Sequence, residues 1–136
     1  MLTALDIREV VLIEALLLEF SPGLSALTGE TGAGKSILLD ALGLALGARG
    51  DAGLVRHGAA AASVTASFDV PADHPSRALL AENGLDGDGE LILRRQLKAD
   101  GGSRAWVNDQ PVSATLLRDL GATLVEVHGQ HDDRGL

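Results

Sequence analysis

The chain has 136 residues, which is the size of a single domain and is long enough to bury a hydrophobic core. Its net charge of −8 argues against a nucleic-acid-binding surface spread over the whole chain, and its hydrophobic content of 46% excludes a disordered polypeptide. The absence of cysteine and of any long apolar run excludes disulfides, thiolate metal sites and a membrane span, which favours a cytoplasmic protein without a membrane partner.

The apolar residues of the N-terminal half first alternate and then recur at helical spacing. Alternation predicts three short strands, at 3–9, 12–20 and 24–28. A glycine-rich loop is expected at 29–34. Helical spacing then predicts a helix that begins at Lys35 and is closed by Gly47, a residue suited to the left-handed conformation that ends many helices.

The C-terminal half contains strand and helix patterns in alternation. Strands are predicted at 63–70, 91–97 and 104–107, the last two joined by a hairpin turn at 100–102. A short helix is predicted at 76–83, and Ser113 is expected to cap a helix that ends near Leu120. The apolar segment 123–128 predicts a final strand that leads into a polar loop. Together these elements predict an α/β fold.

The segment 29–36, GETGAGKS, matches the phosphate-loop pattern G-x-x-x-x-G-K-[ST] between a predicted strand and a predicted helix. Glycines let successive backbone N–H groups point into one concavity, and the helix N-terminus adds partial positive charge. Lys35 is expected to reach the β- and γ-phosphates, and the Ser36 hydroxyl to ligate Mg²⁺. The expected nucleotide-binding residues are Gly29, Glu30, Thr31, Gly32, Ala33, Gly34, Lys35, Ser36 and Ile37.

Hydrolysis by a phosphate-loop protein also needs an acidic residue, usually at the end of another buried strand. The only later apolar strand candidate is 123–128, and its acid, Glu126, lies inside the segment rather than at its end. No apolar quartet ending in Asp-Glu is present. The sequence therefore predicts a nucleotide-binding chain that lacks its catalytic carboxylate.

Two further segments, GARGDAGLVRHGA at 47–59 and EVHGQHD at 126–132, carry a resemblance together with the phosphate loop. In these residues the chain resembles the RecN family of bacterial recombination and repair proteins, which is related to the SMC proteins. The resemblance extends over essentially the whole chain. One departure is Glu9, where the family's opening strand usually has asparagine.

The resemblance implies that residues 1–136 are the N-terminal half of an ABC/SMC-type ATPase head, with a mixed β-sheet, a phosphate-loop helix and an antiparallel β-rich part. It implies ATP and Mg²⁺ as cofactors, a coiled coil after the chain, and the C-terminal half of the same head as a partner. Two heads would engage as a homodimer around ATP, and the full-length protein would handle DNA in double-strand break repair, in the bacterial cytoplasm at the nucleoid. The half-head alone is expected to be inactive.

Residue roles follow from the resemblance at two further positions. Gln130 resembles the glutamine that contacts magnesium and the attacking water in ABC-type heads, and is a candidate catalytic and metal-binding residue with Lys35. Arg49 resembles an arginine that approaches the γ-phosphate in SMC heads. An ordinary surface salt bridge is the alternative for Arg49.

Three other functions remain open from the sequence. A small phosphate-loop kinase would transfer phosphate by this chain alone, but its arginines between 76 and 104 fall mostly in predicted strands and turns. The ATPase half of an ABC transporter would place the glutamine closer to Lys35 than Gln130 lies. A nucleotide-gated assembly module would bind without turnover. No base-reading motif separates ATP from GTP.

Overall fold

The computed structural model describes residues 2–11, 13–19, 32–50, 52–85 and 89–135, and within 32–36 and 125–135 it describes the backbone only. The described strands form one six-stranded sheet in the order β2-β1-β3-β4-β5-β6, and each pair of neighbours is antiparallel. The strands are β1 (Leu2–Val10), β2 (Ile13–Glu19), β3 (Ala61–Phe68), β4 (Leu91–Lys98), β5 (Ser103–Val107) and β6 (Gln110–Val112). A short strand at 24–28 was also predicted, but that segment lies outside the described residues.

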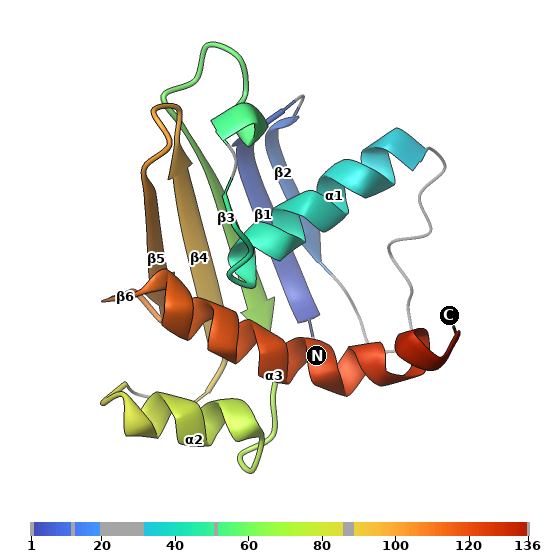
Figure 1. Ribbon diagram of the computed structural model, residues 1–136, viewed down its shortest axis with the longest axis vertical. Coiled ribbons are helices and arrows are strands. Elements are labelled where there is room, and N and C mark those ends of the chain that lie inside the picture. The colour runs from blue at the N-terminus through green and yellow to red at the C-terminus, as the bar shows by residue number, and fades with distance from the viewer. Residues whose placement is uncertain (1, 12, 20–31, 51, 86–88, 136) are drawn as a thin grey trace.

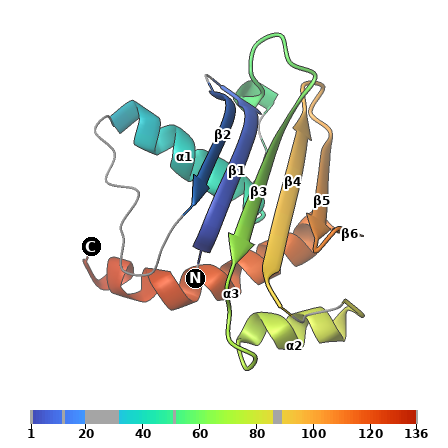
Figure 2. The ribbon, with the colours of Figure 1, turned by 180° about the vertical axis from the view of Figure 1, so that it is seen from behind.

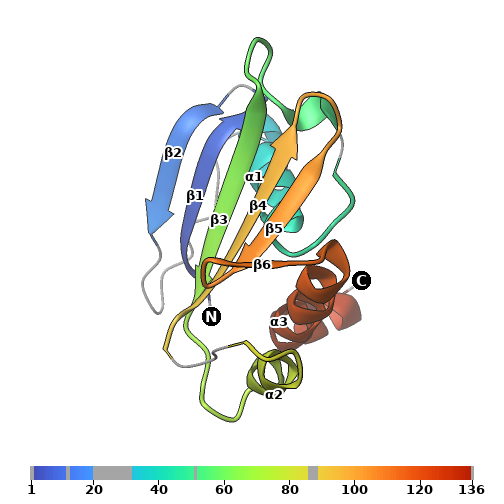
Figure 3. The same ribbon diagram turned by 90° about the vertical axis from the view of Figure 1, so that its left-hand side faces the viewer.

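Four helical segments accompany the sheet: α1 (Gly32–Ala45), the short 3-10 turn η1 (Ala52–Leu54), α2 (Pro75–Glu82) and α3 (Ala114–Gly135). Helices α1 and α3 cross the same face of the sheet (Figure 1). The view from behind shows no described helix over the opposite face (Figure 2). Helix α2 lies at one end of the sheet, beside α3 (Figure 3). The chain is thus a two-layer arrangement with one helical layer.

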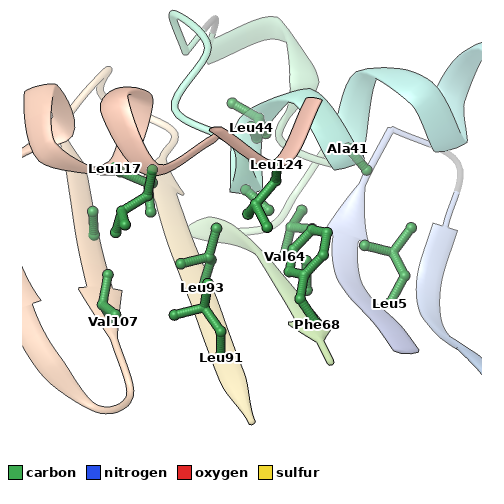
Figure 4. Packing of buried hydrophobic residues seen from close by; sticks show 14 of the residues in the cluster. Leu5, Ala41, Leu44, Val64, Phe68, Leu91, Leu93, Val107, Leu117 and Leu124 are labelled. Atoms are coloured by element: carbon green, nitrogen blue, oxygen red, sulfur yellow. The ribbon is translucent and has the colours of Figure 1, made fainter. Parts of the chain in front are cut away.

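The core fills the space between the sheet and its two crossing helices. Leucine, valine and phenylalanine side chains from β1, β3, β4 and β5 point toward α1 and α3 (Figure 4). Ala41 and Leu44 of α1 and Leu117 and Leu124 of α3 cover them, and all four are buried. Each fully buried leucine contributes about 2 kcal/mol of hydrophobic stabilisation. Because aromatic residues are scarce, aliphatic side chains supply most of this core.

The strands confirm the alternation that predicted them. In β3 every second residue, from Ala62 to Phe68, is buried, and the intervening residues face away from the helices. Strand β6 was not predicted. It pairs with β5 across a two-residue turn in which Asn108 and Asp109 have φ of 49° and 69°. Asparagine and aspartate tolerate this left-handed region, so the Asn-Asp pair was the available signal for a hairpin.

The predicted strand at 123–128 is wrong, because α3 continues from Ala114 through Gly135. Ser113 caps the helix as predicted, with its Oγ accepting a hydrogen bond from the N–H of Leu116 at 3.1 Å. The expected end near Leu120 is not a break: Leu117, Leu120 and Leu124 lie on one helical stripe, and all three are buried. The apolar residues of 123–128 fit the spacing of a strand and also that of a helix. The helix forms because Leu124 continues the buried stripe that begins at Leu117.

The end of β1 holds a strained backbone. Glu9 and Val11 have φ of 58° and 50°, values that are rare outside glycine and asparagine. The carbonyl of Glu9 accepts a hydrogen bond from the N–H of Arg56 at 2.8 Å, and the N–H of Val11 donates to the carbonyl of Leu54 at 2.8 Å. These bonds fasten the segment after η1 to the end of β1 and hold both residues in their unusual conformation.

We therefore expect Glu9→Asn to stabilise the chain, by about 0.5–1 kcal/mol, because asparagine tolerates a left-handed backbone better than glutamate does. The ion pair lost, between Glu9 Oε1 and Arg56 Nη1 at 3.6 Å, is partly exposed and contributes little. Chemical denaturation of the chain measures the effect. Glu9→Ala removes the same ion pair without easing the backbone, so an equal gain in that variant would contradict the explanation.

Candidate nucleotide-binding site

The second half of the phosphate-loop sequence opens α1. Gly32 is the first residue of the helix, so the segment 32–36 forms its first turn rather than the end of a loop, three residues earlier than predicted. The first four N–H groups of an α-helix have no partner within the helix, and together with the helix dipole they favour an anion. The first turn of α1 contains no acidic residue that would repel one.

Of the expected nucleotide-binding residues, Gly29, Glu30 and Thr31 lie outside the described residues. Gly32, Ala33, Gly34, Lys35 and Ser36 are described as helical backbone. Ile37 is partly buried, and its side chain packs against the hydrophobic core.

Helix α1 is held on the sheet by one apolar stripe. Ala41, Leu44 and Ala45 are buried, whereas Leu39 on another side of the helix is 50% exposed. At the far end, Gly47 has φ of 95° and ends the helical segment as predicted, and the N–H of Ala48 donates to the carbonyl of Gly43 at 2.9 Å. The helix is therefore packed on the core from Ile37 to its C-terminal end.

Arg49 lies in the exposed loop that follows this C-terminal end. None of the ion pairs among the described residues involves Arg49, so the alternative of a surface salt bridge finds no support there. Because α1 has 14 residues, its axis of about 20 Å separates its C-terminal end from its first turn. The described part of the chain therefore does not bring Arg49 to the phosphate-loop residues.

Gln130 lies in the last turns of α3, where a loop was expected and only the backbone is described. The C-terminal end of α3 and the N-terminal end of α1 both extend beyond β2 on the same side of the molecule (Figures 1 and 2). The contact of Gln130 with magnesium or water stays a prediction. Among the described side chains, no group of three or more histidines or acids is placed to hold a metal ion.

A single helical layer on an antiparallel sheet, with a phosphate-loop sequence opening one helix, defines a class of nucleotide-binding domain. The chain belongs to the AAA domain family, whose match covers residues 5–111. No helix in the described ranges is both long and apolar enough to cross a membrane.

The resemblance to RecN proteins is confirmed. The chain is 46% identical over 136 residues to the DNA repair protein RecN of Xylella fastidiosa (strain 9a5c), a match that covers all of this chain and 24% of that protein. It is 42% identical over 135 residues to RecN of Bacillus subtilis (strain 168), covering 98% of this chain and 23% of that one. The chain thus spans about a quarter of the length of these curated relatives.

Solved structures confirm the predicted fold class, the fold of SMC-type heads. A chain from work on the ATP-driven dimerization and DNA-stimulated activation of SMC ATPases superposes with a TM-score of 0.68 at 24% sequence identity. The match covers 90% of this chain and 78% of that one. At this identity the likeness concerns the fold.

Proposed function

We propose that the chain is the N-terminal half of the ATPase head of a RecN-type DNA repair protein and binds ATP with Mg²⁺ through residues 29–37. The observation that carries the proposal is the position of the phosphate-loop sequence. Its residues 32–36 form the first turn of a helix anchored on the sheet, with no acidic residue in that turn. The RecN relatives, 42–46% identical over nearly the whole chain, support the particular protein type.

The chemistry of these residues fits a nucleotide and its metal. Backbone N–H groups of the first turn would hold phosphate oxygens, and the Lys35 ammonium would neutralise the β- and γ-phosphates. The Ser36 hydroxyl is a neutral oxygen ligand suited to Mg²⁺, which would offset charge on the phosphates when bound. Gln130 would add a second neutral oxygen near the metal or orient a water.

The site needs a second part to hydrolyse ATP, and we place it in the C-terminal half of the same head. Two large apolar side chains of the described residues remain exposed, Leu17 of β2 at 57% and Leu39 of α1 at 50%. Leu17 lies on an edge strand of the described sheet, and Leu39 lies on a helix that crosses the sheet and extends beyond β2 (Figure 1). Single exposed leucines do not define an interface, so the assignment rests on the RecN relatives, of whose length the chain spans about a quarter.

Two complete heads would then engage around ATP as a homodimer, and hydrolysis would release them. The full-length protein, with its coiled coil, would contact DNA in double-strand break repair and recombination at the bacterial nucleoid. The solved SMC ATPase with the same fold was studied for ATP-driven dimerization, which supports this use of the fold. The net charge of −8 supports DNA contacts that lie outside most of this chain's surface.

Lys35→Ala in the full-length protein tests the site. We expect loss of measurable binding of a fluorescent ATP analogue and a fall in ATP turnover of at least about 100-fold, because the charge on the phosphates loses its main protein counter-charge. Lys98→Ala is a matched control, since Lys35 and Lys98 are the two lysines of the chain. Lys98 lies on β4, and its loss should leave both measurements unchanged.

The same assays on the 136-residue chain test the half-site. Weak nucleotide binding without turnover is expected, because the catalytic carboxylate would come from the C-terminal half. Appreciable ATP turnover by this chain alone would contradict the half-head assignment. Phosphate transfer to an acceptor would instead identify the kinase alternative.

A further inference from the structure

Two consecutive arginines on β4 have opposite environments. Arg94 is exposed, and its guanidinium stacks on the Trp106 ring, 4.1 Å from the ring centroid. Arg95 points to the helical side of the sheet and is only 4% exposed. Its neighbours on that face, Leu93 and Leu97, are buried core residues. An apolar side chain at position 95 would continue the buried row formed by Leu93 and Leu97. Hydrophobic packing therefore does not explain the arginine.

The Arg95 guanidinium binds the C-terminal end of α1. Its Nη1 donates to the carbonyl oxygens of Leu44 at 3.1 Å and Ala48 at 2.9 Å. Its Nε donates to Ser103 Oγ at 2.7 Å, which fixes the plane of the group from the neighbouring strand β5. Neither ion pair of the described residues includes Arg95, so the negative end of the α1 dipole and the carbonyls at that end compensate this cation.

Keeping a cation here has an electrostatic cost. Burial lowers the pKa of Arg95, and the nearby cation of Arg118 on α3 lowers it further. An arginine nevertheless stays charged at any working pH, so the cost is permanent. This electrostatic cost arises at a position that would accept leucine. It therefore indicates that Arg95 has a role in holding α1 in position.

We propose that Arg95 is a positioning residue for the phosphate loop. It pins the C-terminal end of α1 to β4 and so sets the axial position and tilt of the helix whose first turn is residues 32–36. A helix behaves as a stiff rod, so a displacement at one end moves the other, about 20 Å away. The inference rests on the proposed nucleotide site. The sequence alone did not indicate this role, because Arg95 is one polar residue within a predicted strand.

The chain after α1 fits around this anchor. A Cβ atom on Gly50 would lie 2.9 Å from Leu97 Cδ1 and 3.6 Å from Arg95 Nη2. Glycine therefore lets the backbone pass close over β4 beside the guanidinium. The carbonyl of Ala48, two residues earlier, stays within reach of Arg95 as a result.

Arg95→Met in the full-length protein tests the proposal. Methionine replaces the aliphatic part of the arginine side chain and suits the apolar row, but it has no donor for the two carbonyls. We expect the Kd for a fluorescent ATP analogue to rise about tenfold, which corresponds to about 1.4 kcal/mol. Binding is measured well below the melting temperature of each variant, so a change in affinity does not reflect unfolded protein. Arg95→Lys, which keeps the charge with fewer fixed donors, should give an intermediate Kd.

Arg94→Met is the matched control, because it removes the neighbouring arginine and its ring contact on the other face of the strand. It should leave the Kd unchanged. A Kd for Arg95→Met within about twofold of the wild type would overturn the proposal. If that variant does not fold, the same limit applied to Arg95→Lys decides. Lys35→Ala separates the nucleotide site from the positioning role. Unchanged nucleotide binding by Lys35→Ala would refute the nucleotide site itself. Weaker binding by Lys35→Ala, with unchanged binding by the Arg95 variants, would refute only the positioning role.

Discussion

Replacing Gly121 with alanine is expected to lower the free energy of unfolding by at least about 3 kcal/mol. Gly121 is a buried residue of α3, and a Cβ atom there would overlap the backbone carbonyl of Leu46, at the end of α1. Backbone cannot rotate away as a side chain can, so the two helices would have to separate. That separation would loosen the core contacts that both helices make with the sheet.

Chemical denaturation of the 136-residue chain measures this loss, and Gly43→Ala is its control. Gly43 is also a helical glycine, but the nearest atom to an added Cβ is Ala48 Cβ at 3.7 Å, an ordinary contact. Alanine should therefore stabilise α1 by about 0.5–1 kcal/mol through its better helix propensity. Opposite signs for the two substitutions support the close approach of α1 and α3, and a small effect at both positions would contradict it.

The second large effect is expected at Gly47, where alanine should cost about 4 kcal/mol. Two penalties combine at this position. Its φ of 95° is unfavourable for any residue with a side chain, and an added Cβ would overlap the Arg118 backbone. The residue that ends α1 is thus in contact with α3.

Gly58→Ala separates the two penalties. Gly58 has nearly the same φ, 91°, with no atom within 4 Å of an added Cβ. Alanine there should cost only the conformational term of about 1–2 kcal/mol. The difference between the two variants measures the contact with α3. Equal losses would show that the backbone conformation alone requires glycine at Gly47.

The sequence predicted the elements whose signals are local. Alternation placed β3 and β4, a Gly-Gly turn placed the β4–β5 hairpin, and Ser113 marked the start of α3. The spacing of apolar residues gave the wrong element at 123–128, where it fits both a strand and a helix. The choice between them depends on burial against a sheet whose strands are distant in the chain. Strand β6 was not predicted, because three residues are too few to show the alternation of a strand.

The candidate site divides in the same way. The phosphate-loop residues were predicted because their motif occupies consecutive positions and can be recognised without the fold. Arg95 was not, since its partners Leu44 and Ala48 lie 51 and 47 residues away in the chain. Gly121 carried no prediction, because the helix was expected to end near Leu120, and only the close approach of Leu46 gives it a role. Such roles arise from tertiary contacts, which no local pattern records.

Strand β2 gives the sheet an open border among the described strands. Such a border offers unpaired backbone groups to any chain that can add a strand, including another copy. Its apolar centre, Ala15 to Leu18, is bracketed by the exposed carboxylates of Glu14 and Glu19. Two copies meeting there would bring like charges together, whereas a strand with basic ends would not. The border can thus discriminate against self-assembly into fibres while remaining open to a partner of opposite charge.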